Sequence, residues 1–163
     1  MERLYHVTED DTVIGPVNRN DAHNRSLLHR AGIVFVVRGD GKILLTWRSP
    51  TKETFPNMYD SSCAFHVTFG ESYEEAAKRE LREETGIRSN PKYLGKFMFR
   101  EPPENEMVAV FKCESDSVPV LDSTESADAI YHSAVDVDKI VTSGRVTPWL
   151  REGWQLLKSR SFD

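Results

Sequence analysis

Three closely spaced glutamates are the residues of this chain whose type and spacing point most directly to chemistry. They are Glu80, Glu83 and Glu84, and they belong to a stretch, residues 73–85, that is predicted to be helical. At about 100° per residue, their side chains fall within an arc of about 100° on such a helix. Ala76 shares this arc and Leu81 lies near its edge, so the acids are expected on the side of the helix that packs.

The ends of this helix are marked by residues that favour helix termini. Ser72 followed by Glu75 has the spacing of a capping box, in which each side chain accepts a hydrogen bond from the other residue's backbone. Gly86 is typical of the residue that follows a helix. These two signals predict the limits of the helix independently of the glutamates.

Carboxylates gathered in this way require a positive partner. Like charges four residues apart on a helix repel by roughly 0.2–0.5 kcal/mol even when exposed, and burying them unpaired costs far more. Oxygen ligands suit a hard divalent cation, and Mg²⁺ usually keeps waters and bridges to substrate phosphates. The cluster therefore predicts a magnesium site, with Mn²⁺ as an alternative ion. The competing interpretation is a solvated helix stabilised by pairs such as Glu74 with Lys78.

Length and composition predict one domain over residues 1–163, with 39% hydrophobic and 29% charged residues. No apolar run approaches the roughly 18 residues of a membrane span. Cys63 and Cys113 do not form a disulfide framework, which favours a reducing, cytoplasmic location. The net charge of −5 argues against a nucleic-acid polymer as partner. The oligomeric state stays open, with a homodimer among the alternatives.

Strands and helices alternate along the rest of the chain. Strand-like runs fall at residues 31–37, 42–47, 61–67, 93–100, 106–113 and 129–132. The first two flank Gly39-Asp40-Gly41 and read as a hairpin. A helix is expected at residues 134–142, and a last one begins at Pro148 with Thr147 as its cap. This order predicts an α/β fold in which helices cover both faces of a mixed sheet.

The sequence Arg-Glu-Leu-Arg-Glu-Glu-Thr-Gly-Ile at residues 79–87, with an earlier glutamate at Glu71, resembles the Nudix box. The resemblance implies an α/β/α sandwich and an enzyme that hydrolyses a nucleoside diphosphate linked to another group. It implies Glu80 and Glu84 as the main metal ligands, with Glu83 assisting. It also implies that Arg79 orients the carboxylates and that Glu71 supports the preceding loop. One departure is Phe65, which occupies the position of the first glycine of the box.

A second set of residues resembles the isopentenyl-diphosphate isomerase-like branch of the Nudix superfamily, over roughly residues 5–155. In those isomerases three histidines and two glutamates surround a metal. His29, His66, Glu104 and Glu106 match these places, whereas His23 is displaced by one residue. We therefore assign Glu104 to metal binding, Glu106 to metal binding or water activation, and His66 to substrate binding.

Two observations favour a hydrolase over an isomerase. The catalytic cysteine of the isomerases falls at Ala64, and the neighbouring Cys63 would point to the opposite face of a strand. The isomerases also lack the complete acidic box that is present here.

Hydrolysis of a diphosphate also needs cations for the phosphates and an acceptor for the proton of the attacking water. Arg48 and Lys52 are the candidate diphosphate ligands, and the proton acceptor is Glu83, Glu104 or Glu106. Other interpretations are a catalytically inactive Nudix-fold module that binds nucleotides and a cysteine enzyme that uses Cys63 with His66. The group attached to the diphosphate is not encoded by any motif.

Overall fold

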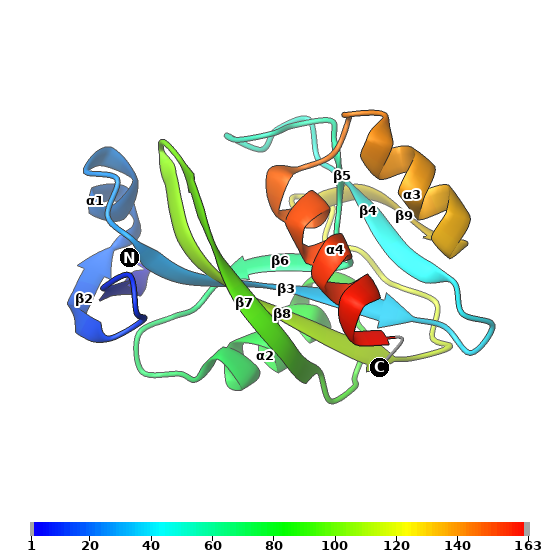
Figure 1. Ribbon diagram of the computed structural model, residues 1–163, viewed down its shortest axis with the longest axis horizontal. Coiled ribbons are helices and arrows are strands. Elements are labelled where there is room, and N and C mark those ends of the chain that lie inside the picture. The colour runs from blue at the N-terminus through cyan, green and yellow to red at the C-terminus, as the bar shows by residue number, and fades with distance from the viewer. Residues whose placement is uncertain (1, 162–163) are drawn as a thin grey trace.

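The computed structural model describes residues 2–161, which form both strands and helices (Figure 1). In chain order they are β1 Arg3–Val7, β2 Val13–Asn18, α1 Arg19–Asn24, β3 His29–Val37, β4 Ile43–Arg48, β5 Tyr59–Asp60, β6 Cys63–His66, α2 Tyr73–Thr85, β7 Lys92–Glu101, β8 Glu104–Glu114, β9 Ser126–His132, α3 Ala134–Thr142 and α4 Pro148–Ser161.

Strand β3 lies at the centre of the sheet and pairs with four other strands, β1, β4, β6 and β8. It runs parallel to β8 over nine residue pairs, from His29 opposite Glu106 to Val37 opposite Glu114. It runs antiparallel to β6, with Gly32 opposite Phe65. Beyond these pairings, β7 lies on the outer side of β8, and β4 carries β5 and β9. The chain thus brings together strands that are far apart in the sequence.

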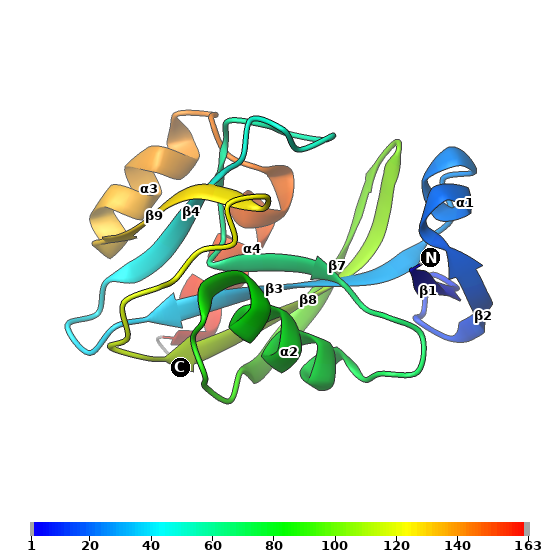
Figure 2. The same ribbon diagram turned by 180° about the vertical axis from the view of Figure 1, so that it is seen from behind.

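Helices α2 and α4 cover opposite faces of this sheet, as the front and back views show (Figures 1 and 2). On one face Ile33 and Phe35 pack with Trp154 of α4. On the other face Val34 packs with Leu81 of α2. The alternation follows from the strand geometry, in which successive side chains point to opposite faces. The predicted α/β/α sandwich is confirmed.

The elements that carry the predicted acids form as the sequence indicates. Helix α2 has the predicted bounds, both hydrogen bonds of the capping box are present, and Gly86 adopts a left-handed conformation with φ of 71°. The strands agree with the predictions to within about three residues at each end. None of the helices within residues 2–161 is long and apolar enough to cross a membrane.

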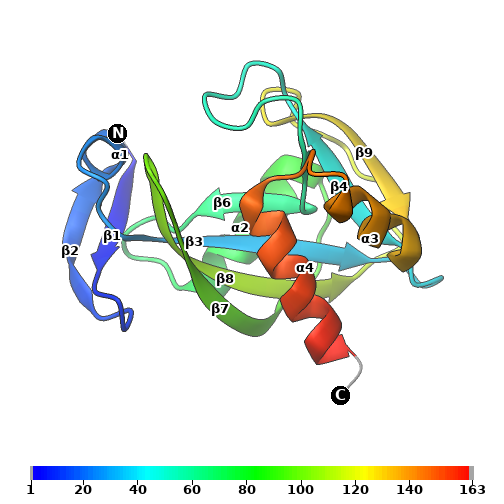
Figure 3. The ribbon, with the colours of Figure 1, turned by 45° about the horizontal axis from the view of Figure 1, so that its top comes forward.

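The N-terminal elements β1, β2 and α1 were not predicted, and they lie together at one end of the molecule (Figure 3). Strand β2 contains Gly15 and Pro16, both of which are unfavourable in strands. Helix α1 has only six residues and begins at the cap Asn18, whose side chain accepts a hydrogen bond from the backbone of Asp21. Such short elements depend on tertiary packing more than on local propensity.

Phe65, the residue at the position of the first box glycine, is accommodated by a glycine on the neighbouring strand. Phe65 is 8% exposed and faces Gly32, its register partner on β3. A Cβ atom added at Gly32 would lie 2.4 Å from Cζ of the Phe65 ring. The aromatic side chain therefore occupies space that only a glycine at residue 32 leaves open.

We expect the substitution Gly32→Ala to lower the free energy of unfolding by about 1–3 kcal/mol, because it overpacks this contact. The same substitution should be less destabilising in a Phe65→Ala background, where the ring is absent. Chemical denaturation of the two single variants and the double variant measures this coupling. Equal effects of Gly32→Ala in both backgrounds would show that the two residues do not constrain each other.

Candidate functional site

One cavity of about 410 Å³ collects most of the residues that the sequence singles out. Its walls come from β3, β6, β8, α2 and the loop after β4. Its predicted site residues are Arg48, Lys52, His66, Glu80, Glu84, Glu104 and Glu106. Three others, Glu71, Arg79 and Glu83, lie on or next to α2 but do not line the cavity. The predicted candidates thus divide into a group that faces the cavity and a group behind it.

Glu80 and Glu84 are the acids of α2 that face the cavity. Burial, and then the charge of Glu80, raise the pKa of Glu84 well above its ordinary value. Burial also raises the pKa of Glu80, although Arg79 acts in the opposite direction. Among residues 2–161, Glu84 has no ion-pair partner, whereas Glu80 is paired with Arg79 at 2.7 Å. A cation between these two carboxylates would supply the missing positive charge.

Arg79 binds both Glu80, which faces the cavity, and Glu71, which does not, and it thereby links α2 to the loop before it. Its guanidinium group lies 2.7 Å from both Glu71 and Glu80. Glu71 also accepts a hydrogen bond from the backbone N–H of Thr68 at 2.9 Å. Burial opposes ionisation of Glu71, but the hydrogen bonds from Arg79 and Thr68 prevail and lower its pKa. This geometry suits the positioning roles that were expected of Arg79 and Glu71.

Glu83 is placed differently from the other two acids of the helix. Its side chain is 53% exposed and pairs with Arg79 at 3.1 Å. The expectation that all three glutamates share the packed side of α2 therefore holds for Glu80 and Glu84 but not for Glu83. The reason is that Glu83 lies at the edge of the arc, on the side toward solvent.

A second cluster of ligand-type side chains is rich in histidine, and two of its members, His66 and Glu104, line the cavity. Ligand-type atoms of His23, His29, His66 and Glu104 all lie within 4.8 Å of one another. Glu104 approaches His23 at 3.6 Å, and Glu106 approaches His66 at 3.5 Å. These side chains come from α1, β3, β6 and β8, so the cluster exists only in the assembled sheet.

The hydrogen bonding of this cluster leaves lone pairs available to a cation. Leu27 holds the ring of His29, since its carbonyl oxygen lies 2.8 Å from Nδ1 and can only accept a hydrogen bond. This leaves the Nε2 lone pair of His29 directed into the cluster, where Nε2 has no hydrogen-bond partner among the described residues. Nε2 of His23 and Oε2 of Glu104, which lie 3.6 Å apart, likewise have no hydrogen-bond partner among the described residues. Buried polar atoms without hydrogen-bond partners are rare in folded proteins, and a bound cation would satisfy these three.

Burial determines the protonation of these groups. It lowers the pKa of His29 to about 3, with a further contribution from His66, so the ring is neutral at pH 7. Burial and the neighbouring Glu106 raise the pKa of Glu104 to about 7. Neutral imidazoles with a carboxylate suit Mn²⁺, Zn²⁺ or Fe²⁺ better than Mg²⁺, whereas the all-carboxylate pair Glu80 and Glu84 suits Mg²⁺ or Mn²⁺. Both sets of residues thus fit a divalent metal by their donor chemistry.

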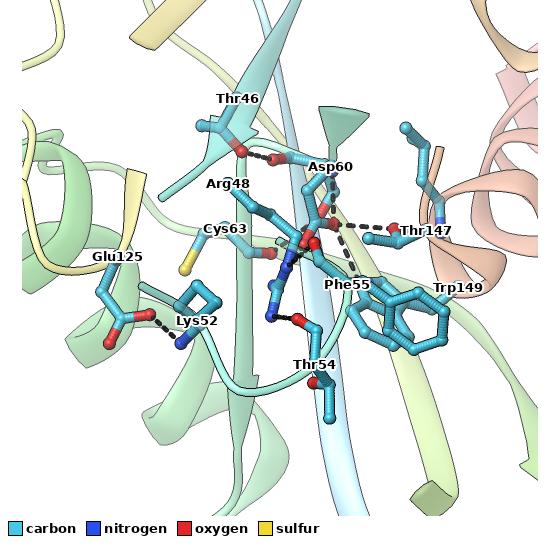
Figure 4. A network of polar contacts seen from close by, with 12 residues as sticks. Thr46, Arg48, Lys52, Thr54, Phe55, Asp60, Cys63, Glu125, Thr147 and Trp149 are labelled. Atoms are coloured by element: carbon cyan, nitrogen blue, oxygen red, sulfur yellow. Dashed lines mark hydrogen bonds and ion pairs between the residues drawn. The ribbon is translucent and has the colours of Figure 1, made fainter. Parts of the chain in front are cut away.

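Arg48 and Lys52, the two predicted diphosphate ligands, have different surroundings (Figure 4). Arg48 is 8% exposed and forms a 2.9 Å ion pair with Asp60. Its remaining donors bind the carbonyl oxygens of Thr54 and Phe55, so it holds the loop after β4. Lys52, on that loop, is partly exposed and pairs with Glu125 at 2.7 Å.

The cysteine considered as a nucleophile lies outside the cavity. Cys63 is 2% exposed and faces α2, whereas the next residue, Ala64, lines the cavity. Burial, followed by the charge of Glu84, raises the pKa of the Cys63 thiol well above its ordinary value. A reactive cysteine needs a lowered pKa and access to solvent, so this geometry disfavours a cysteine mechanism.

Two residues of the cavity region escaped the sequence analysis. His23 was set aside because it is displaced by one residue from the isomerase pattern, yet α1 brings it into the cluster. Glu125 lies in the segment before β9 and belongs to no motif. Only the pairing of distant segments reveals either residue.

Comparison with known proteins shows likeness to two kinds of enzyme. Residues 27–152 match the NUDIX domain. An isopentenyl-diphosphate Delta-isomerase 1 of Photorhabdus laumondii is 29% identical over 100% of this chain and 98% of that protein. A Nudix hydrolase of Deinococcus radiodurans is 32% identical over 76% of this chain and 74% of that protein.

Solved structures share the fold of this chain. DR0079 from Deinococcus radiodurans superposes with a TM-score of 0.80 and 27% identity, covering 98% of this chain and 99% of that chain. A MutT protein from Methanosarcina mazei superposes with a TM-score of 0.73 at 20% identity, which concerns the fold alone. Since the NUDIX match covers most of the sequence and includes the whole of α2, this chain belongs to the Nudix family.

Proposed function

We propose that this protein is a divalent-metal-dependent hydrolase that cleaves the diphosphate bond of a small molecule, of the class in which a nucleoside diphosphate is linked to another group. The observation that carries the proposal is the pair Glu80 and Glu84, which faces the cavity and in which Glu84 has no cationic partner among the described residues. The box that supplies this pair is complete from Arg79 to Ile87. Relatives named Nudix hydrolase support the reaction class.

In this proposal Glu80 and Glu84 hold Mg²⁺ or Mn²⁺, and the cluster of His23, His29, His66 and Glu104 holds a second divalent ion. Metal ions at these places would supply Lewis-acid stabilisation of the charge that develops on the phosphoryl oxygens. Arg79 orients Glu80 through the 2.7 Å ion pair, and Glu71 holds Arg79 in place.

The remaining residues of the cavity act on the substrate and the attacking water. Lys52 contributes a mobile positive charge for the diphosphate, while Arg48 fixes the loop that presents it. Glu106 accepts the proton of the water, since its carboxylate lines the cavity and Glu83 lies outside it. In this proposal His66 binds the second ion in place of the substrate-binding role expected from the sequence, and its Nε2 lies 3.5 Å from Glu106.

An isomerase of isopentenyl diphosphate is the alternative function, and the histidine cluster is the observation that favours it. One relative with that name aligns over the whole chain. Against it, Ala64 occupies the cavity position expected for the catalytic cysteine, and Cys63 faces α2. An alanine has no group that can transfer a proton.

A substrate panel separates these functions. With Mg²⁺ or Mn²⁺ present, we expect release of a nucleoside monophosphate or phosphate from at least one dinucleotide, nucleotide sugar or nucleotide coenzyme. Chromatography of the products identifies the bond that is cleaved. Conversion of isopentenyl to dimethylallyl diphosphate, without hydrolysis of any panel member, would favour the isomerase.

The variant Glu84→Gln tests the carboxylate pair. Without metal its free energy of unfolding should rise by roughly 0.5 kcal/mol, since the repulsion from Glu80 is relieved. Turnover should be abolished. The neighbouring variant Glu83→Gln is the control, and it should lose only an exposed ion pair with Arg79. Thermal unfolding in EDTA and the panel assay provide the readouts. A Glu84→Gln protein with full turnover contradicts the metal assignment.

The variant His23→Ala tests the second metal site. Calorimetric titration with Mn²⁺ should show two classes of site in the wild-type protein. His23→Ala should weaken one class by about tenfold or more, and Glu84→Gln should remove the other. His132→Ala is the matched control, because this half-buried histidine lies outside the cluster. Identical titrations of the His23→Ala and wild-type proteins would rule out a metal at the histidines.

A further inference from the structure

An ion pair on the wall of the cavity joins a predicted diphosphate ligand to an acid outside every motif. The Nζ atom of Lys52 lies 2.7 Å from Oε2 of Glu125, and both residues line the cavity (Figure 4). The side chains remain 23% and 35% exposed, respectively. In this arrangement the positive charge of Lys52 is already occupied by a carboxylate from the protein itself.

The backbone around Glu125 is fixed, so only the side chain needs to move for the pair to open. The carbonyl oxygen of Glu125 accepts a hydrogen bond from the N–H of Ser49 at 3.1 Å. The N–H of Glu125 donates to the carbonyl oxygen of Asp122, and the N–H of Asp122 donates to that of Glu84, both at 3.0 Å. The segment 122–125 therefore connects the end of α2 to the loop that carries Lys52.

Of the two cations predicted for the diphosphate, only Lys52 can change its partner at low cost. Arg48 is buried and bound by Asp60 and two backbone carbonyls, and breaking a buried pair of this kind is strongly destabilising. The pair of Lys52 with Glu125 is partly exposed, and such pairs contribute little to stability. A diphosphate in the cavity offers Lys52 more negative charge than one carboxylate does.

The carboxylate that Lys52 would release lies close to the acids of α2. The N–H of Asp122, in the segment that ends at Glu125, donates to the carbonyl oxygen of Glu84 at 3.0 Å, and Glu125 and Glu84 both line the cavity. A rotation of the Glu125 side chain away from Lys52 would therefore add a negative group at the end of the cavity where Glu80 and Glu84 gather. That end is also where the proposed function places a metal ion.

We propose that Lys52 and Glu125 form an exchangeable pair: the diphosphate of the substrate displaces Glu125 from Lys52, and the released carboxylate joins Glu80 and Glu84 around the metal. Glu125 thus has two roles. Before the substrate binds, it competes with the diphosphate for Lys52, and afterwards it adds a carboxylate to the acidic site. This inference rests on the proposed function for its second step, whereas its first step concerns binding alone.

Calorimetric titration with methylenediphosphonate, a diphosphate that cannot be hydrolysed, tests the first step when it is done in EDTA without a divalent metal. The variant Glu125→Gln should bind it about two- to fivefold more tightly than the wild-type protein, because Lys52 is no longer occupied by a charge. The variant Lys52→Met should bind it more weakly. Glu9→Gln is the matched control, since it removes a carboxylate paired with Arg100 away from the cavity and should leave binding unchanged.

The second step is tested by steady-state kinetics, with a substrate that the panel has identified. Glu125→Gln should lower kcat by about tenfold or more while KM falls or stays constant. A purely structural pair predicts weaker binding and a higher KM instead. Unchanged or weaker binding of the diphosphonate by Glu125→Gln overturns the exchange, and an unchanged kcat overturns the role at the metal. Because the titration requires no turnover, it remains decisive even if every panel substrate fails and the proposed hydrolase is wrong.

Discussion

The structure depends on two carboxylates being held together at the C-terminal half of one helix. Glu80 and Glu84 face the cavity near the negative end of the α2 dipole, which adds to their mutual repulsion. Burial raises the pKa of both groups, so their charge is costly without a counter-ion. The capping box and the packing of Leu81 on the sheet hold the helix against this cost. The pair is thus a preformed site, and a cation bound there would balance the negative charge of the two carboxylates.

The rest of the cavity combines parts from across the chain around the central strand β3. His29 begins this strand, and β6 and β8 on its two sides bring His66 and Glu104 alongside it. The short helix α1 adds His23 from the N-terminal unit. One cavity is therefore lined by the carboxylate pair of α2 and by two members, His66 and Glu104, of the histidine-rich group. The two donor sets differ in the ions they prefer, which allows two metals to be distinguished chemically.

The sequence predicts most of the fold, and seven of the residues that it singles out line the candidate site, for identifiable reasons. Helix α2 could be placed to the residue because Ser72, Glu75 and Gly86 are local signals. Glu104 and Glu106 could be placed on one face because strands alternate. By contrast, the solvent-facing position of Glu83 and the buried pair of Arg48 depend on which neighbours surround them. The entry of His23 into the cluster and the contact of Lys52 with Glu125 join segments that no local pattern relates.

Anomalous diffraction from crystals soaked in MnCl₂ is the most direct test of the central claim. The account predicts a manganese peak within coordination distance of the carboxylates of both Glu80 and Glu84. Saturating manganese with no peak at these two side chains would contradict it, and it would mean that the acids of α2 are tolerated without a metal.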